Sequence, residues 1–175
     1  MSTPASQNET AQQSKCGSSL TYRQAGPSDI PALARIRAIS WSTEDYWRER
    51  IAGYLNCIVH PRDALEPRVI YVAETEAEVM GLIAGHLTRR LGCEGELEWI
   101  DVIPDQRRKR IASNLVRLLA EWFVQHGASR ICVDPGNGPA RTFYRTLAAQ
   151  DLNAHWMFWP DIRLLVTNAE THSAD

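Results

Sequence analysis

The sequence predicts a mixed α+β domain with the element order β-α-α-β-β-β-α-β-α-β-β. Three observations support this prediction. The chain has 175 residues, of which 44% are apolar and 23% charged, so it can bury a core of its own. Apolar, β-branched runs separated by turn residues occupy its middle part, and an apolar stripe with the helical period of 3.6 follows at 111–122. The strand, helix and strand expected over 96–133 indicate a parallel crossover.

Composition divides the chain into three parts. Residues 1–18 are rich in Ser, Thr, Gln and Asn and predict a disordered tail. Residues 19–167 are expected to form a single domain, and residues 168–175 a flexible C-terminus. The formal net charge of −2 excludes a general basic field, and the sequence contains no run of 18 apolar residues. The four cysteines form no CxxC pair and the histidines have no metal-ligand spacing, so we expect a cytoplasmic protein with no metal and no membrane span.

The first half of the chain is predicted to form a short strand, two helices and then three further strands. The strand covers 20–24, and Ser28 or Asp29 is expected to cap the helix that follows. Residues 42–45, Ser-Thr-Glu-Asp, open a second helix. Strands are then predicted at 69–74, 79–89 and 94–102, with a turn at 76–78.

The second half begins with the apolar-striped helix. Asp105 is its expected N-cap, and Gly127 suits its C-terminal end. A buried strand is predicted at 129–133, followed by a glycine-rich turn at 134–139 and a short helix at 140–147. Two terminal strands are expected at 151–159 and 162–167.

Four basic residues, Arg107-Arg108-Lys109-Arg110, are predicted to occupy the first turn of the striped helix. The N-terminal end of a helix carries a partial positive charge, so cations there are mildly destabilising. Because free N–H groups at such an end favour phosphate, we interpret the run as half of a polyphosphate site. Two alternatives stay open: a solvated basic surface, and a localisation or nucleic-acid patch.

The segment 102–112, Val-Ile-Pro-Asp-Gln-Arg-Arg-Lys-Arg-Ile-Ala, resembles the acyl-CoA-binding signature of the GNAT N-acetyltransferase superfamily. That signature places V-x-P at a strand end and Q/R-x-x-G-x-G/A at a helix start. Arg107 matches its first position and Ala112 its last, whereas Arg110 replaces the middle glycine. In the family this glycine lets backbone N–H groups approach the pyrophosphate. The resemblance therefore implies that the Arg110 side chain points outward.

A second segment supports the resemblance. Asn137, Ala140, Phe143, Tyr144 and Leu147 match the family pattern N-x-x-A-x-x-F-Y-x-x-L, about 30 residues after the first motif. Together the two motifs imply a GNAT-type mixed central sheet, flanked by helices and splayed at the central strand. They also imply acetyl-CoA as co-substrate, with these cofactor-binding residues: Ile100, Asp101, Val102, Arg107, Arg108, Lys109, Arg110, Ile111, Ala112, Ser113, Asn137 and Arg141.

The resemblance also assigns catalytic roles. It implies that Tyr144 protonates the departing thiolate and that a backbone N–H at 100–102 stabilises the oxyanion. The base is expected from Glu96 or Glu98, which are two apart on one strand and so share a face; mutual repulsion would raise the pKa of one of them. The plainer alternatives are a core aromatic for Tyr144 and a solvated strand face for the glutamates.

The function implied is transfer of an acetyl group from acetyl-CoA to a primary amine by direct attack in a ternary complex. A non-catalytic acyl-CoA-binding domain is the first alternative, because of Arg110. A nucleic-acid-binding module using the patch at 107–110 is the second. The acceptor amine is not predicted, and a homodimer stays open. We expect neither a nucleic acid nor a membrane as partner.

Overall fold

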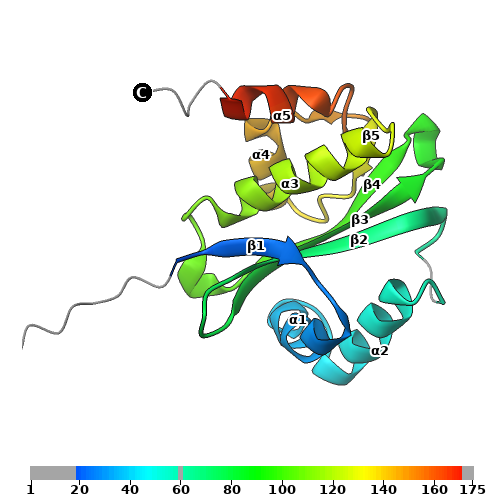
Figure 1. Ribbon diagram of the computed structural model, residues 1–175. Coiled ribbons are helices and arrows are strands. Elements are labelled where there is room, and N and C mark those ends of the chain that lie inside the picture. Colours follow the sequence, from blue (N-terminus) through cyan, green and yellow to red (C-terminus); the bar gives the residue numbers. More distant parts are fainter. Residues whose placement is uncertain (1–18, 59–60, 171–175) are drawn as a thin grey trace, which may run out of the picture.

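The computed structural model describes residues 19–58 and 61–170 of the chain (Figure 1). The predicted tail at 1–18 lies outside the described residues, as do residues 171–175 of the predicted flexible C-terminus. The element order predicted from the sequence is confirmed, with one further helix at the C-terminal end.

A seven-stranded sheet of order β1-β2-β3-β4-β5-β7-β6 forms the centre of the fold. Its only parallel pair among the described residues is β4 with β5, as the predicted crossover requires. The other neighbouring strands are antiparallel. The strands are β1 (Thr21–Gln24), β2 (Ala64–Glu74), β3 (Val79–Thr88), β4 (Gly95–Val102), β5 (Ile131–Val133), β6 (Gln150–Asp151) and β7 (Met157–Trp159).

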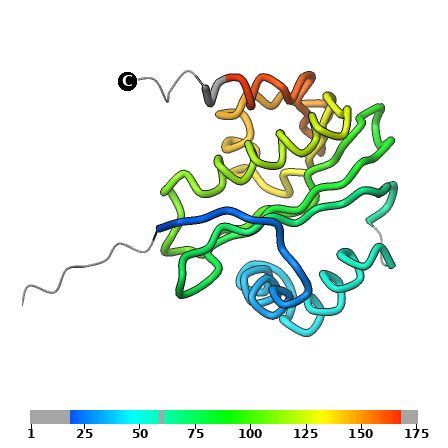
Figure 2. Tube along the Cα trace, in the orientation of Figure 1, coloured from blue at the N-terminus to red at the C-terminus, as the bar shows by residue number. Residues whose placement is uncertain are grey.

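Helices cover both faces of the sheet (Figure 1). On one face lie α1 (Ile30–Ala38) and α2 (Glu44–Leu55), and α2 begins with Thr43, whose hydroxyl accepts a hydrogen bond from the Tyr46 N–H. On the other side lie α3 (Ile111–Gln125), α4 (Gly138–Thr146) and α5 (Arg163–Glu170). The chain trace in Figure 2 shows the same two layers. None of the helices described is long and apolar enough to cross a membrane.

Each face of the sheet has its own apolar core. On the α3 side, Leu115, Leu119 and Phe123 pack against Ile83 and Ile131. On the α1 and α2 side, the buried core consists of Leu33, Ala34, Ile51, Tyr54, Leu82, Trp99 and their neighbours. The apolar stripe of α3 thus faces the sheet as its 3.6-residue period predicts.

A β-bulge at Glu98 changes which residues of β4 face each core. Ala84 pairs with Trp99 while the next residue of β3, Gly85, pairs with Leu97, so Glu98 is the extra residue. Leu97 consequently belongs to the α3-side core, whereas Trp99 belongs to the opposite core, although the two are separated by two positions. The bulge therefore places Glu98 and Trp99 in succession on the α1 and α2 side, and the alternation of β4 is reversed from Trp99 onward.

The helix start differs from the prediction. The basic run 107–110 precedes α3 instead of forming its first turn, and Asp105 lies in a short 3-10 helix, η3 (Pro104–Gln106). The N-cap residue of α3 is Arg110, in the left-handed conformation. In the first half of the chain, Asp29 is the N-cap residue of α1, one of the two predicted, but its carboxylate makes no capping hydrogen bond and pairs with Arg23 instead.

The C-terminal prediction was wrong for 162–167, which begins helix α5 instead of forming a strand. Ile162 and Leu165 are buried and Val166 packs against the same core, whereas Leu164 is exposed. This spacing of three and four is that of a helix face, and α5 lies against α3. Helix α5 also includes residues 168–170. The predicted 151–159 region holds both terminal strands, the short antiparallel pair β6 and β7, with β6 beginning one residue earlier, at Gln150.

Candidate active site

A cleft opens where β4 separates from its parallel neighbour. Pairing with β5 ends at Leu97 and Val133, yet β4 continues to Val102, paired on its other side with β3. Residues 98–102 therefore lie beyond the β4–β5 ladder. The cleft holds about 880 Å³ and reaches from α1 and α2 to the starts of α3 and α4.

The cleft brings together residues from both sequence motifs and from β4. Among the predicted site residues, its lining includes Glu96, Glu98, Ile100, Asp101, Val102, Arg107, Ala112, Asn137 and Tyr144. The remaining predicted residues do not belong to this lining: Arg108, Lys109, Arg110, Ile111, Ser113 and Arg141. Most of the predicted side chains thus share one cavity although they are as much as 48 positions apart in sequence.

The loop before α3 is fastened to the end of β4. Arg107 Nε donates a hydrogen bond to the Val102 carbonyl at 3.1 Å. Arg108 and Arg110 both have φ of +62°, a conformation that glycine adopts without strain. The first hydrogen bond of the helix runs from the Asn114 N–H to the Arg110 carbonyl, at 3.0 Å. The N–H groups of residues 111–113 therefore have no carbonyl partner within the helix and can donate to an anion.

The start of α4 forms the opposite wall of the cleft. The Asn137 side chain accepts a hydrogen bond from the Ala140 N–H at 2.9 Å and so caps the helix. Tyr144 lies about two helical turns after Asn137, packed edge-on against Trp159 with ring centroids 5.7 Å apart. Its side chain is therefore both part of the core and part of the cleft wall. Arg141 points elsewhere, pairing with Asp151 and lining a small adjoining pocket.

Burial raises the pKa of Tyr144, and the nearby Asp101 carboxylate raises it further. The phenol therefore keeps its proton throughout the ordinary pH range. A protonated phenol in a cleft wall can donate a hydrogen bond or a proton to a developing anion.

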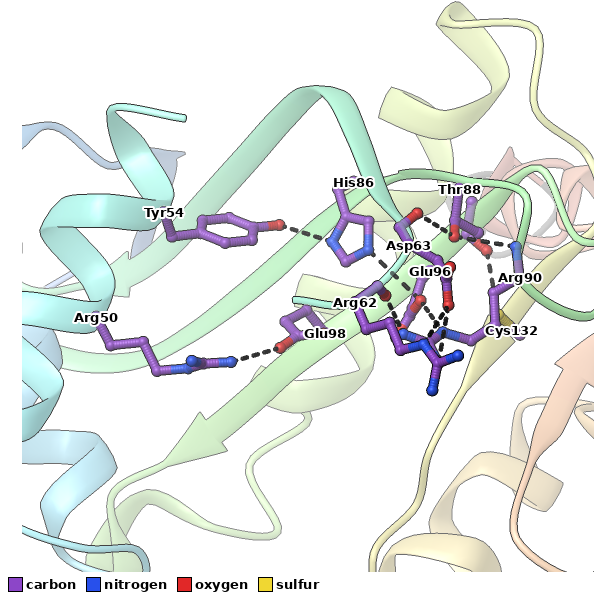
Figure 3. Close-up of polar contacts among 11 residues, drawn as sticks. Arg50, Tyr54, Arg62, Asp63, His86, Thr88, Arg90, Glu96, Glu98 and Cys132 are labelled. Carbon is purple, nitrogen blue, oxygen red and sulfur yellow. Dashed lines mark hydrogen bonds and ion pairs between the residues drawn. The ribbon is translucent and has the colours of Figure 1, made fainter. Parts of the chain in front are cut away.

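A chain of buried polar groups runs from α2 over β3 to β4, where it reaches the cleft at Glu96 (Figure 3). The Tyr54 hydroxyl lies 3.1 Å from Nδ1 of His86, which is fully buried. His86 Nε2 lies 3.5 Å from Oε2 of Glu96, its cross-strand partner, and has no hydrogen-bond partner among the described residues. Arg90 Nε donates to the same Glu96 oxygen at 2.8 Å. Glu96 is thus a buried carboxylate whose charge is balanced by Arg90.

Glu98 is the freer of the two glutamates. Its nearest cation is Arg50, with Nη2 3.8 Å from Oε1, which exceeds hydrogen-bond length. Burial raises the pKa of Glu98, and repulsion from Glu96 raises it further, against the attraction of His86, Arg50 and Arg90. A carboxylate whose pKa is shifted toward neutrality and which lines a cleft is suited to accept a proton.

His86, Glu96 and Glu98 also place three potential ligand atoms within 4.8 Å of one another. Arg90 already neutralises Glu96, binding its Oε2 at 2.8 Å, so a metal ion there would bring a further positive charge close to Arg90. The arrangement of charges therefore fits a proton-transfer site better than a cation site.

Asp101 is held by Arg37 of α1, and both side chains are largely buried. Burial raises the pKa of Asp101, although the Arg37 guanidinium opposes the shift. The Arg37 guanidinium also lies 4.1 Å above the Trp47 ring. The pair fixes the α1 side of the cleft against the end of β4.

Three arginines of the site were not predicted: Arg37, Arg50 and Arg90. The place of His86 in the buried chain of polar groups was not predicted either. Arg37 and Arg50 come from α1 and α2, whose distance from β4 no local sequence pattern reveals. The position of His86 in the middle of a predicted strand fits a strand-face residue or one that lines the acceptor cleft, and does not reveal its partners. Knowledge of the β3–β4 register would have identified one, because this register sets His86 opposite Glu96.

Comparisons with known proteins agree with this geometry. Residues 32–148 match the sequence model of the acetyltransferase (GNAT) family. A GNAT family acetyltransferase from Brucella melitensis, solved in complex with acetyl-CoA, has a TM-score of 0.60 and 19% identity over 82% of this chain and 90% of its own. Aminoglycoside 6'-acetyltransferase type Ii has a TM-score of 0.66 and 17% identity over 81% and 97%.

A third similar structure is PaiA N-acetyltransferase from Thermoplasma acidophilum in complex with coenzyme A. Its TM-score is 0.59, with 15% identity over 80% of this chain and 96% of its own. A comparison with curated proteins found no significant match.

Proposed function

The chain belongs to the GNAT acetyltransferase family, and on that premise we propose that it transfers the acetyl group of acetyl-CoA to a primary amine by direct attack within a ternary complex. The observation that supports this most is the separation of β4 from β5 after Leu97. It opens one cleft onto the basic loop, the start of α4 and the glutamates of β4.

Acetyl-CoA fits the side of the cleft nearest α3 and α4. Backbone donors at the start of α3, with Arg107 beside them, suit the pyrophosphate. Arg108, Lys109 and Arg110 are exposed around the same turn and add positive charge. The β4 segment 100–102, beyond the β4–β5 ladder, suits the pantetheine arm. The thioester supplies an already activated acyl group.

Glu98 is the proposed general base. The acceptor amine must lose a proton to attack, and Glu98 offers an accepting oxygen in the same cleft, with a raised pKa. The nitrogen then forms a bond to the acetyl carbon while the carbon–sulfur bond breaks. Glu96 contributes by its charge, which keeps the pKa of Glu98 high.

Tyr144 is the proposed donor to the departing sulfur. Its phenol is protonated at neutral pH and faces the cleft from α4. The electron pair of the broken bond goes to sulfur, and the Tyr144 proton stabilises it. The nitrogen gives up a second proton as the amide forms, and this proton restores the Tyr144 phenol. The reaction as a whole thus yields an acetylated amine and free CoA, with the first amine proton left on Glu98 and released from there to solvent.

Binding and turnover are tested separately with the full chain. Thermal unfolding is measured with acetyl-CoA and with RNA, and we expect acetyl-CoA alone to raise the melting temperature. Thiol release is then followed with a panel of amines, and mass spectrometry identifies the acetylated product. Binding without thiol release for any amine would instead indicate a non-catalytic acyl-CoA-binding domain. Stabilisation by RNA but not by acetyl-CoA would indicate a nucleic-acid-binding module.

A further inference from the structure

The part of the cleft next to α2 contains several charged side chains at close range (Figure 3). Arg50 reaches Glu98 from α2, and Arg90 binds Glu96. Trp41, Trp99 and Trp156 supply apolar surface in the same cavity. Any amine that Glu98 deprotonates must lie among these groups, so their chemistry selects the acceptor.

Two arginines of the cleft already bind carboxylates of the protein itself. Arg37 pairs with Asp101, and Arg90 hydrogen-bonds Glu96 at 2.8 Å. Arg50 differs from both. Its guanidinium stays 3.8 Å from Glu98 and lies 5.8 Å from the Trp99 ring centroid, and its side chain is 29% exposed. It therefore has N–H donors directed at the cavity that a substrate anion can occupy.

We propose that the acceptor is an α-amino acid, whose amine lies at Glu98 and whose carboxylate binds Arg50. This inference rests on the proposed acetyltransferase function. The base and the guanidinium are only 3.8 Å apart, so the two substrate groups that complement them must be close neighbours as well. An amine and a carboxylate attached to one carbon meet this requirement, and a guanidinium binds a carboxylate through two parallel hydrogen bonds.

The charge of the cleft disfavours the other common classes of amine. Five arginines and four carboxylates line it: Arg37, Arg50, Arg62, Arg90 and Arg107 against Glu96, Glu98, Asp101 and Asp134. A polyamine or an aminoglycoside carries several positive charges and would require an excess of carboxylates. A peptide N-terminus has an amide where the α-amino acid has its carboxylate, and would offer Arg50 only a neutral carbonyl instead of a charged, two-oxygen acceptor.

The first test compares acceptors that differ only in this carboxylate. Thiol release is measured with a set of α-amino acids, the corresponding α-carboxamides, spermidine and kanamycin. We expect kcat/KM for the preferred amino acid to exceed that for its carboxamide by about 10- to 100-fold, the ratio that a charged hydrogen bond supplies. Spermidine and kanamycin should react more slowly than the amino acid.

The second test removes the guanidinium. Arg50→Gln is compared with Arg48→Gln, a matched control on the same helix whose partner is Glu44 and which is not part of the cleft. Rates are measured above the acidic limb of the pH profile, because loss of Arg50 also raises the pKa of Glu98. We expect Arg50→Gln to raise KM for the amino acid by about 10- to 100-fold and to leave KM for the carboxamide unchanged. Arg48→Gln should change neither.

The outcomes separate this inference from the function on which it rests. Turnover of spermidine, kanamycin or the carboxamide at a rate equal to that of the amino acid would overturn the inference and leave the acetyltransferase function in place. An unchanged KM in Arg50→Gln would do the same. Absence of thiol release with every amine would overturn both.

Discussion

Arg110 stands at a backbone conformation that normally belongs to glycine, and two substitutions there separate backbone strain from charge. Its φ of +62° and ψ of +7° place it in the left-handed region at the N-cap of α3. The Arg110 side chain is exposed, so replacing it removes little packing. Arg110→Gly removes the guanidinium and the Cβ strain together. Arg110→Ala removes the guanidinium and keeps the strain.

The expected magnitude follows from this geometry. A non-glycine residue in the left-handed region costs about 1–2 kcal/mol relative to glycine. Glycine in turn loses about 0.5–1 kcal/mol through the greater freedom of the unfolded chain. Arg110→Gly should therefore increase the free energy of unfolding by about 0.5–1 kcal/mol over Arg110→Ala. For a chain of 175 residues this corresponds to a melting temperature about 1–4 °C higher.

The measurement is thermal and urea unfolding of both variants beside the parent protein at neutral pH. Loss of the cation near the helix start is common to the two variants, so it cancels from their difference. Equal stability of the glycine and alanine variants would refute the strain argument. Acetyl-CoA affinity is measured in parallel, and both variants should bind more weakly if the Arg110 guanidinium reaches a phosphate.

Three further predictions concern the cleft. Glu98→Gln should lower kcat by about 10²- to 10⁴-fold and abolish the acidic limb of the kcat/KM profile. Glu96→Gln should instead move that limb to lower pH, because Glu96 raises the pKa of Glu98. Identical pH profiles for both variants and the parent protein would remove the glutamates from the mechanism. Tyr144→Phe should lower kcat with KM for acetyl-CoA unchanged, and undiminished turnover would leave Tyr144 with a packing role alone. Arg37→Met should lower the free energy of unfolding in urea by about 3 kcal/mol at neutral pH, because it leaves the buried Asp101 charge without its partner. The loss should be smaller at low pH, where Asp101 is protonated. A loss that does not depend on pH would contradict this account.

Much of the site's location could be predicted from local sequence signals. The apolar stripe of α3, the Asn137 cap of α4 and the spacing between the two motifs are properties of contiguous segments. Parallel pairing of the strands on either side of α3 then brings both motifs to one end of the sheet. Alternation of side chains along a strand likewise predicted that Glu96 and Glu98, two residues apart, lie near each other.

Local signals failed where the outcome depended on contacts between distant segments. The apolar residues of the segment 162–167 suit either a strand or a helix. Packing against α3 stabilises the helical form, α5. The basic run was expected within a helix, whereas the left-handed conformation at Arg110 delays the helix start to Ile111.

The sequence alone thus determined the family, the order of elements and the two motif segments that border the cleft, because each depends on residues close together in the chain. Only the tertiary structure decided which residues give the cleft its chemistry. The β3–β4 register sets His86 opposite Glu96 and close to Glu98. The packing of α1 and α2 on the sheet brings Arg37 to Asp101 and Arg50 to Glu98. Burial, a property of the whole fold, then raises the pKa of Glu98 and Tyr144.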